Sequence, residues 1–278
     1  AARRAEAEGF EVHTRIQDKP GATAIIATRA QSRLRIFEDC LEIGIRKFIL
    51  EKILTNCRSE VPLFADLARQ HSARVISHNR WELLNVHLKM AELRGKFDLG
   101  ELISITITGG NFCAVSGGIH LFSLANRLIP LETLHVDFSD LDLSQPSPRG
   151  KGLKLVGGRI AASTPDGSAN LFADFNKRGQ MASTFRANFR RGTIAFDVGG
   201  PLELSWARKT ESQYTTAEIR SSMELSKKDP FREAIRLIES SFLNSKEANL
   251  NWQSALKSTD FILRQIDGGK ATERIPVT

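Results

Sequence analysis

The sequence predicts an α/β fold followed by an α+β unit, and three observations support this. Short apolar runs alternate with helix-like segments up to about residue 77, as in a parallel sheet with helical crossovers. Beyond residue 133, apolar and polar residues alternate in successive runs, as in a large, mainly antiparallel sheet. The 278 residues, 41% hydrophobic and 26% charged, are enough for two ordinary domains. We expect a partial parallel α/β domain over 1–77 and an α+β domain over 78–278, whose C-terminal helices pack back on the first.

Three short apolar runs in the first unit have the composition of buried parallel strands: residues 22–28, 47–50 and 74–77. Between the first two runs, Leu34, Phe37 and Leu41 recur at helical spacing. Gly44 follows where a glycine commonly ends a helix. Ser59 is placed to cap a second helix before the third run. The order strand, helix, strand, helix, strand predicts right-handed crossovers.

A different pattern begins after residue 80. Four residues at helical spacing predict a helix with one buried face: Trp81, Leu84, Leu88 and Ala91. Residues 102–108 alternate like a half-exposed strand, and we expect a helix over roughly 118–128. Five further alternating runs predict strands: residues 134–138, 158–162, 169–175, 182–189 and 193–198. Asp229 and Pro230 supply a cap and a first-turn proline for one late helix, and a last helix includes Trp252 and Ile262 on its apolar face.

Several classes of protein do not fit this sequence. No run of about 18 uncharged apolar residues is present, and the first residues lack the apolar core of a secretion signal, so we expect no membrane span. Cys40, Cys57 and Cys113 have no C-x-x-C spacing, which favours a reducing, cytoplasmic location. The histidines lack metal-ligand spacing, and we expect no metal.

The formal charge of +7 is concentrated in one stretch, residues 147–196, which holds nine basic and two acidic residues. Two interpretations stay open: solvated outward-facing strand residues, or a surface for a phosphorylated or nucleotide-linked sugar. Nucleic acid is the disfavoured partner, because the stretch has no recognition helix and no exposed aromatic ladder.

Polar residues follow each of the three predicted parallel strands, where ligands collect in such sheets. Thr28 follows the first strand, Glu51 and Lys52 follow the second, and Arg80 comes shortly after the third. A glutamate beside a lysine can orient the ammonium group for proton transfer. The alternative is an exposed loop pair without a role.

A second cluster lies at a strand-to-helix junction, where Ser116 precedes two glycines and His120. Paired glycines let the backbone approach a ligand closely, and His120 falls in the first turn of an otherwise apolar helix. A structural histidine is the alternative interpretation.

Five short motifs in order resemble the Gfo/Idh/MocA oxidoreductases over nearly the whole chain. They are Ala24 to Thr28, Gly44 to Leu54 with its Glu-Lys pair, Arg80, Leu99 to Leu102, and Gly118 to His120. The resemblance implies a Rossmann-like domain followed by an antiparallel-sheet domain, NAD or NADP as cofactor, and a homo-oligomer, either dimer or tetramer.

The resemblance also implies roles for individual residues. Lys52 would hold or protonate the reacting oxygen of a sugar, and His120 would be its acid/base partner. The implied cofactor-binding residues are Ala27, Thr28, Glu51 and Lys52, and the implied substrate-binding residues are Arg80, Ser116 and His120. The implied function is hydride transfer between a nicotinamide and a hydroxyl or carbonyl carbon of a sugar or nucleotide sugar.

The chain departs from the family at four positions. Ile53 stands where the family has proline and Arg33 where it has histidine, as in a branch associated with sugar or surface-polysaccharide biosynthesis. Ser116 and Ser123 stand where the family has aspartates, so an acid that could support His120 is missing. The glycine-rich phosphate turn is also absent, and we expect about 40 residues of the dinucleotide-binding half upstream. A non-catalytic binding or structural subunit therefore stays open as the alternative.

Overall fold

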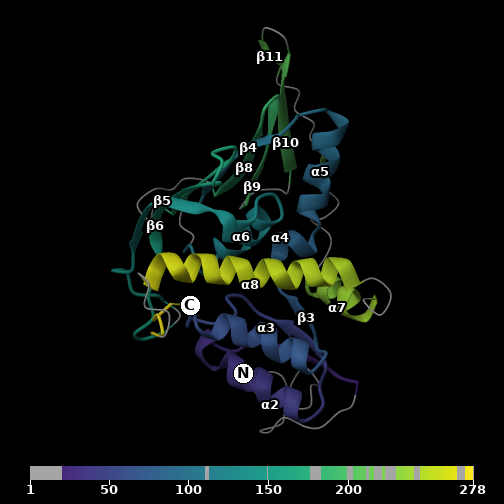
Figure 1. Ribbon diagram of the computed structural model, residues 1–278, viewed down its shortest axis with the longest axis vertical. Helices are drawn as coiled ribbons and strands as arrows, with labels where there is room; N and C mark the ends of the chain where they lie inside the picture. Colours follow the sequence, from purple (N-terminus) through teal and green to yellow (C-terminus); the bar gives the residue numbers. More distant parts are fainter. Residues whose placement is uncertain are drawn as a thin grey trace.

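The computed structural model describes residues 21–109, 113–148, 150–175, 183–198, 203–210, 213–215, 221–222, 230–240, 245–267 and 273–277. Two sheets lie at opposite ends of the molecule, and helix α8 runs between them (Figure 1). This arrangement confirms the predicted fold class, a small parallel sheet followed by a larger mixed one. The predicted cap at Asp229 lies outside the described residues.

The parallel sheet has the order β1-β2-β3 and is built from Thr23–Ile26, Lys47–Leu50 and Arg74–Ser77. Its crossovers are α2 (Ala30–Glu42) and α3 (Glu60–Gln70). The strands form where the sequence predicts them, except that β1 ends at Ile26 and leaves Ala27 and Thr28 in the following loop. Gly44 has φ of +91° directly after α2, a conformation that favours glycine.

The predicted cap by Ser59 is only positional. Ser59 precedes α3 but makes no side-chain cap hydrogen bond. Its backbone is already helical, with φ −63° and ψ −17°, whereas a capping side chain needs extended backbone to reach back to the helix N–H groups. Its Oγ lies 3.2 Å from Cys57 Sγ instead.

The prediction of a single helix after residue 80 is wrong. The chain forms α4 (Arg80–Leu83) and α5 (Val86–Lys96), separated by Asn85 in the left-handed conformation at φ +57°. This break turns the second helix, so the predicted apolar face does not continue through it. Trp81 and Leu84 are buried, whereas Leu88 is 46% exposed and Ala91 is exposed.

The large sheet has the strand order β11-β10-β9-β8-β4-β7-β6-β5, with β12 paired to β10. Its strands are β4 (Leu102–Thr108), β5 (His135–Asp142), β6 (Gly157–Ser163), β7 (Asn170–Phe175), β8 (Thr184–Phe189), β9 (Gly192–Asp197), β10 (Glu203–Thr210), β11 (Gln213–Thr215) and β12 (Ser221–Ser222). Pairing is antiparallel except between β4 and β7, which run parallel. Ile105 and Ile107 point into the core, and Thr106 between them faces the other side.

Helices α6 (Ile119–Asn126), α7 (Pro230–Ser240) and α8 (Ser245–Asp267) complete the fold, with a short 3-10 turn η1 at Leu131–Thr133. Helix α8 contacts both sheet units. The ring of Trp252 lies 6.5 Å from that of Phe64 on α3, and the ring of Phe261 lies 5.7 Å from that of Phe122 on α6. These aromatic pairs make one continuous apolar core under both sheets. The division at residue 77 stays a prediction.

Candidate functional site

Lys52 follows β2 and reaches the segment that precedes α6. Its Nζ donates a hydrogen bond to the backbone oxygen of Ser116 at 2.5 Å. The structure thus joins the ends of two segments that the sequence singled out separately, 64 positions apart. Ser116 contributes its carbonyl group to this contact, not its hydroxyl.

The carboxylate of Glu51 lies against the backbone of Lys52 and the ring of His78. Glu51 Oε1 accepts the N–H of Lys52 at 2.9 Å, and Oε2 lies 3.7 Å from His78 Nδ1. Burial would raise the pKa of Glu51, but the hydrogen bonds from His78 and the Lys52 backbone, with the charges of both residues, outweigh it and lower the pKa to about 2. Glu51 is therefore a fixed negative charge beside Lys52.

His120 is the second residue of α6, is half-buried, and contacts the start of α4. The backbone N–H of Arg80 donates to His120 Nδ1 at 3.3 Å. Burial lowers the pKa of His120, the charge of Lys52 lowers it further, and the charge of Glu51 opposes them, so the pKa falls to about 3. The ring is neutral at physiological pH, and because Nδ1 is the acceptor, Nε2 carries the proton.

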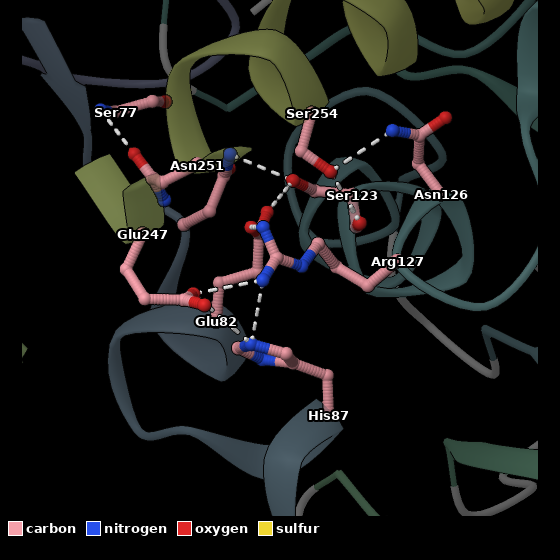
Figure 2. A network of polar contacts seen from close by, with 10 residues as sticks. Ser77, Glu82, His87, Ser123, Asn126, Arg127, Glu247, Asn251 and Ser254 are labelled. Atoms are coloured by element: carbon pink, nitrogen blue, oxygen red, sulfur yellow. Dashed lines mark hydrogen bonds and ion pairs between the residues drawn. The ribbon is translucent and has the colours of Figure 1, made fainter. Parts of the chain in front are cut away.

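A buried polar network joins α6 to the loop after β3 and to helices α4 and α8 (Figure 2). Asn79 Nδ2 donates to Ser123 Oγ at 2.8 Å, and Ser123 Oγ donates to Glu82 Oε1. Ser254 on α8 donates to the Ser123 carbonyl at 3.0 Å. Position 123 is a serine where an aspartate was expected, and the carboxyl group beside it comes from Glu82 instead. The sequence contains no indication of this role of Glu82.

Glu82 itself is 4% exposed. Burial raises its pKa to about 8, although the hydrogen bond from Ser123 and the charge of Arg127 oppose the increase. The carboxyl group is therefore largely protonated at neutral pH. Such a network is favourable when its members are satisfied, because unpaired buried polar groups are costly.

Arg33 was noticed in the sequence only as a departure, and the structure gives it a structural role. Arg33 is 2% exposed, and its guanidinium donates to the backbone oxygens of Glu51 (2.7 Å), Ile53 and Thr28. Burial lowers its pKa to about 10, with the charge of Glu51 acting against burial. Arg33 thereby ties together the loops that follow β1 and β2.

A cavity of roughly 300 Å³ opens at these two loops. All four residues expected to bind the cofactor line it: Ala27, Thr28, Glu51 and Lys52. Ile53 and Leu153 add apolar walls, while Arg29 and Gln31 add polar groups. The expected substrate residues do not line this cavity, but Ser116 contacts Lys52, and Arg80 contacts His120.

The segment 273–277 closes one wall of this cavity through Val277. Asn56 and Ile275 exchange two hydrogen bonds of 2.7 and 2.8 Å, and Lys154 donates its N–H to Pro276 at 2.5 Å. The segment therefore joins the loop after β2 to the segment before β6. No local pattern could have predicted this contact across 219 positions.

None of the described basic residues of 147–196 lines this cavity, although Lys154 follows Leu153 and forms a β-bridge with Val277. Arg159 pairs with Asp174 on the sheet, and Arg191 pairs with Asp98 at the turn between β8 and β9. Arg149, Lys177 and Arg178 lie outside the described residues.

Within the described ranges, no group of three or more histidine, cysteine or acidic side chains is arranged to hold a metal ion. No helix in that part of the chain is both long and apolar enough to cross a bilayer.

The fold of this chain is similar to the folds of several solved oxidoreductases. The fold is similar to that of KijD10, a 3-ketoreductase from Actinomadura kijaniata solved with NADP and TDP-benzene, at a TM-score of 0.70 and 13% identity over 100% of this chain and 87% of that chain. Its open conformation gives a TM-score of 0.65 at 13% identity over 91% and 78% of the two chains. An oxidoreductase from Pseudomonas syringae gives 0.61 at 13% identity over 90% and 77%.

At this identity the likeness establishes the fold, a Rossmann-like sheet followed by a large mixed sheet. The sequence matches no protein-family model and no curated protein.

Proposed function

We propose that this chain is an NAD(P)-dependent oxidoreductase of the Gfo/Idh/MocA type acting on a hydroxyl or carbonyl carbon of a sugar or nucleotide sugar. The observation that carries the proposal is the contact of Lys52 with Ser116 beside the cavity at Thr28 and Glu51. It sets an ammonium group at the carboxyl edge of a parallel sheet, where dinucleotide-binding folds do their chemistry. The 3-ketoreductase with the same fold was solved with NADP and a TDP compound, which supports this substrate class.

The cavity suits the nicotinamide end of such a cofactor. Its apolar walls at Ala27, Ile53 and Leu153 can cover a planar ring, while Thr28 offers a hydroxyl group for polar contact. At roughly 300 Å³ it accommodates only part of a dinucleotide. When bound, the nicotinamide supplies or accepts a hydride.

Lys52 is the group that we expect to move a proton. In reduction, its Nζ donates a proton to the carbonyl oxygen of the sugar as the carbon accepts the hydride, so the carbonyl becomes a hydroxyl and Lys52 is left neutral. In oxidation, neutral Lys52 takes the hydroxyl proton. The fixed charge of Glu51 favours the ammonium form electrostatically.

In this proposal His120 acts as a neutral hydrogen-bond donor and not as a charged acid. A neutral ring with its proton on Nε2 donates a hydrogen bond to the same oxygen or to a neighbouring hydroxyl. The N–H of Arg80 orients this ring, and the Asn79–Ser123–Glu82 network anchors α6, the helix that carries it. His120 therefore orients the sugar, and Lys52 transfers the proton.

We also propose that the protein forms a homo-oligomer through the open face of the large sheet. The strand pairing places Phe138 on β5 and Phe172 on β7 in one row across this face, on either side of Ala161 on β6. Phe138 is 50% exposed and Phe172 is 41% exposed. Aligned apolar groups on a sheet face are typical of interaction surfaces.

Transfer of deuterium tests the proposed function. The full-length protein is incubated with NADPH or NADH deuterated at the reactive carbon and a TDP-linked keto sugar, and the sugar product is analysed by mass spectrometry. We expect one deuterium at the reduced carbon. Binding of the keto sugar without any transfer with either cofactor would favour the non-catalytic subunit.

A further inference from the structure

Segment 273–277 lies against the cavity at Lys52, although the two are far apart in the sequence. Val277 lines the cavity and is 3% exposed, and Ile275 is 6% exposed. Both side chains belong to the apolar core that lies under the two sheets. The segment is therefore packed like an interior element and not like a surface loop.

Asn56, in the loop after β2, binds this segment through three of its polar atoms. Its backbone oxygen accepts the N–H of Ile275 at 2.8 Å, and its Nδ2 donates to the Ile275 oxygen at 2.7 Å. Its Oδ1 accepts a hydrogen bond of 3.2 Å from Arg274 Nη1. Asn56 is 4% exposed, so loss of these partners would leave buried polar atoms unpaired. The same loop supplies Lys52 and Ile53 to the cavity, which ties that side of the cavity to the segment.

Arg274 extends these contacts to two helices of the parallel-sheet unit. Its Nη1 also donates to the backbone oxygen of Gln31 at 3.1 Å, in the first turn of α2, and Gln31 lines the cavity. Its Nη2 pairs with Glu60 Oε1 at the start of α3, and Thr55 donates to the other oxygen of Glu60. One guanidinium therefore binds α2, α3 and the loop between β2 and α3.

Another wall of the cavity comes from the large-sheet unit. Leu153 lines the cavity, and the next residue, Lys154, donates its N–H to the Pro276 oxygen at 2.5 Å. Lys154 also forms a parallel β-bridge with Val277. Segment 273–277 is thus hydrogen-bonded both to the loop after β2 and to the residue that follows Leu153. Because hydrogen bonds are directional, these contacts together fix the place of Val277 in the cavity lining.

Given the proposed function, on which this inference rests, we propose that segment 273–277 is a clasp for the cofactor. Arg274 is its positioning residue, and Val277 is the side chain that the clasp keeps in the wall facing the nicotinamide ring. Arg274 does not line the cavity itself, so it acts through the segment. Without Arg274 a smaller fraction of the molecules holds the formed wall, and the apparent affinity for the ring falls with that fraction.

Two ligands that differ only in the nicotinamide ring test this proposal, NADH and ADP-ribose. Calorimetric titration of the full-length protein gives the Kd of each, with NADPH and the phosphorylated ADP-ribose as the pair if the wild type prefers NADPH. Arg274→Met and Val277→Ala each weaken binding of the complete cofactor roughly threefold to tenfold and leave binding of the ring-free ligand unchanged. Arg236→Met, at an exposed arginine paired with Glu233, is the matched control.

The pair of ligands separates loss of the clasp from a general loss of folded protein. Partial unfolding weakens both ligands equally, whereas loss of the clasp weakens only the ligand that carries the ring. Wild-type binding of the cofactor with unchanged affinity in either variant, or with equal losses for the two ligands, would overturn this proposal alone. Absence of cofactor binding in the wild type would overturn the proposed function and the clasp with it.

Discussion

Two glutamates, 31 positions apart in the sequence, behave in opposite ways in this fold. Glu51 lies at the mouth of a cavity with its side chain 28% exposed, and its pKa falls to about 2. Glu82 is 4% exposed, and its pKa rises to about 8. Burial raises the pKa of both carboxyl groups. For Glu51, the hydrogen bonds from the backbone of Lys52 and the ring of His78 more than offset this increase.

The regions around Glu51 and Glu82 therefore have different tasks. At Glu51 a permanent charge faces a cavity and a lysine, which is useful for moving protons to a ligand. At Glu82 a mostly neutral acid joins helices α4 and α6 behind the site, where a charge would be costly. We therefore propose that the chemistry takes place at Lys52 and Glu51, while Glu82 joins α4 to Ser123 on α6, the helix that carries His120.

The largest expected effect tests the first region. Lys52→Ala lowers kcat for reduction of the keto sugar by roughly a hundredfold to ten-thousandfold, because it removes the proton donor. Steady-state kinetics and thermal unfolding are measured together, and we expect little change in stability. Lys89→Ala, at a partly exposed lysine paired with Glu92, is the matched control. Equal kcat in Lys52→Ala and wild type would assign the proton transfer to another group.

Arg33→Met tests whether the loops around Glu51 depend on a buried cation. The variant leaves several buried carbonyl groups without a donor, and we expect the free energy of unfolding to fall by about 3 kcal/mol. Denaturant unfolding measures the change, and Arg69→Met, an exposed arginine on α3, provides the control. A loss below that of the control would mean that the carbonyl contacts contribute little.

Glu82→Gln tests the second region through pH. The folded-state pKa of about 8 lies above the ordinary value of 4.5, so this carboxyl contributes stability that is fully present below pH 4.5 and is lost as the pH rises through about 8. Relative to the glutamine variant, the unfolding free energy of the wild type should fall by up to about 1.4 kcal/mol per pH unit in that window. Glu92→Gln serves as the exposed control. Parallel curves for wild type and Glu82→Gln would show that Glu82 is ionised in the folded state.

Glu51→Gln should give a smaller effect of the opposite sign. Because the folded-state pKa of about 2 lies below 4.5, this carboxylate contributes stability above pH 4.5 that is lost as the pH falls through about 2. We expect a difference of about 1 kcal/mol at neutral pH, since the group is partly exposed to solvent. Urea unfolding of both proteins between pH 2 and pH 7 would record it. A difference that grows as the pH falls would contradict the assigned pKa.

The sequence predicted the parts of this molecule that depend on local patterns. The strands at 47–50 and 74–77 form as expected, because continuous apolar runs specify buried parallel strands. It could not predict the break at Asn85, since a single left-handed residue leaves the helical spacing of apolar residues intact. As a result, Leu88 was assigned to a buried face that the structure exposes.

Lys52 and His120 were found at strand and helix ends, where polar residues are conspicuous in the sequence. Glu82 gave no such signal, because an acidic residue in a helix is usually solvated and its burial depends on Ser123, 41 positions away. Val277 was likewise hidden, since it reaches the cavity only through the return of the chain to Asn56. Tertiary contacts of this kind have no local pattern.

Calorimetric titration of the full-length protein with NADPH and NADH tests the central claim most directly. We expect saturable binding of at least one cofactor, its loss in Thr28→Trp, which fills the cavity at the strand ends, and its retention in Leu88→Trp, an exposed position outside that cavity. No binding of either cofactor at millimolar concentration, or equal binding by wild type and Thr28→Trp, would contradict the assignment of this cavity to a nicotinamide.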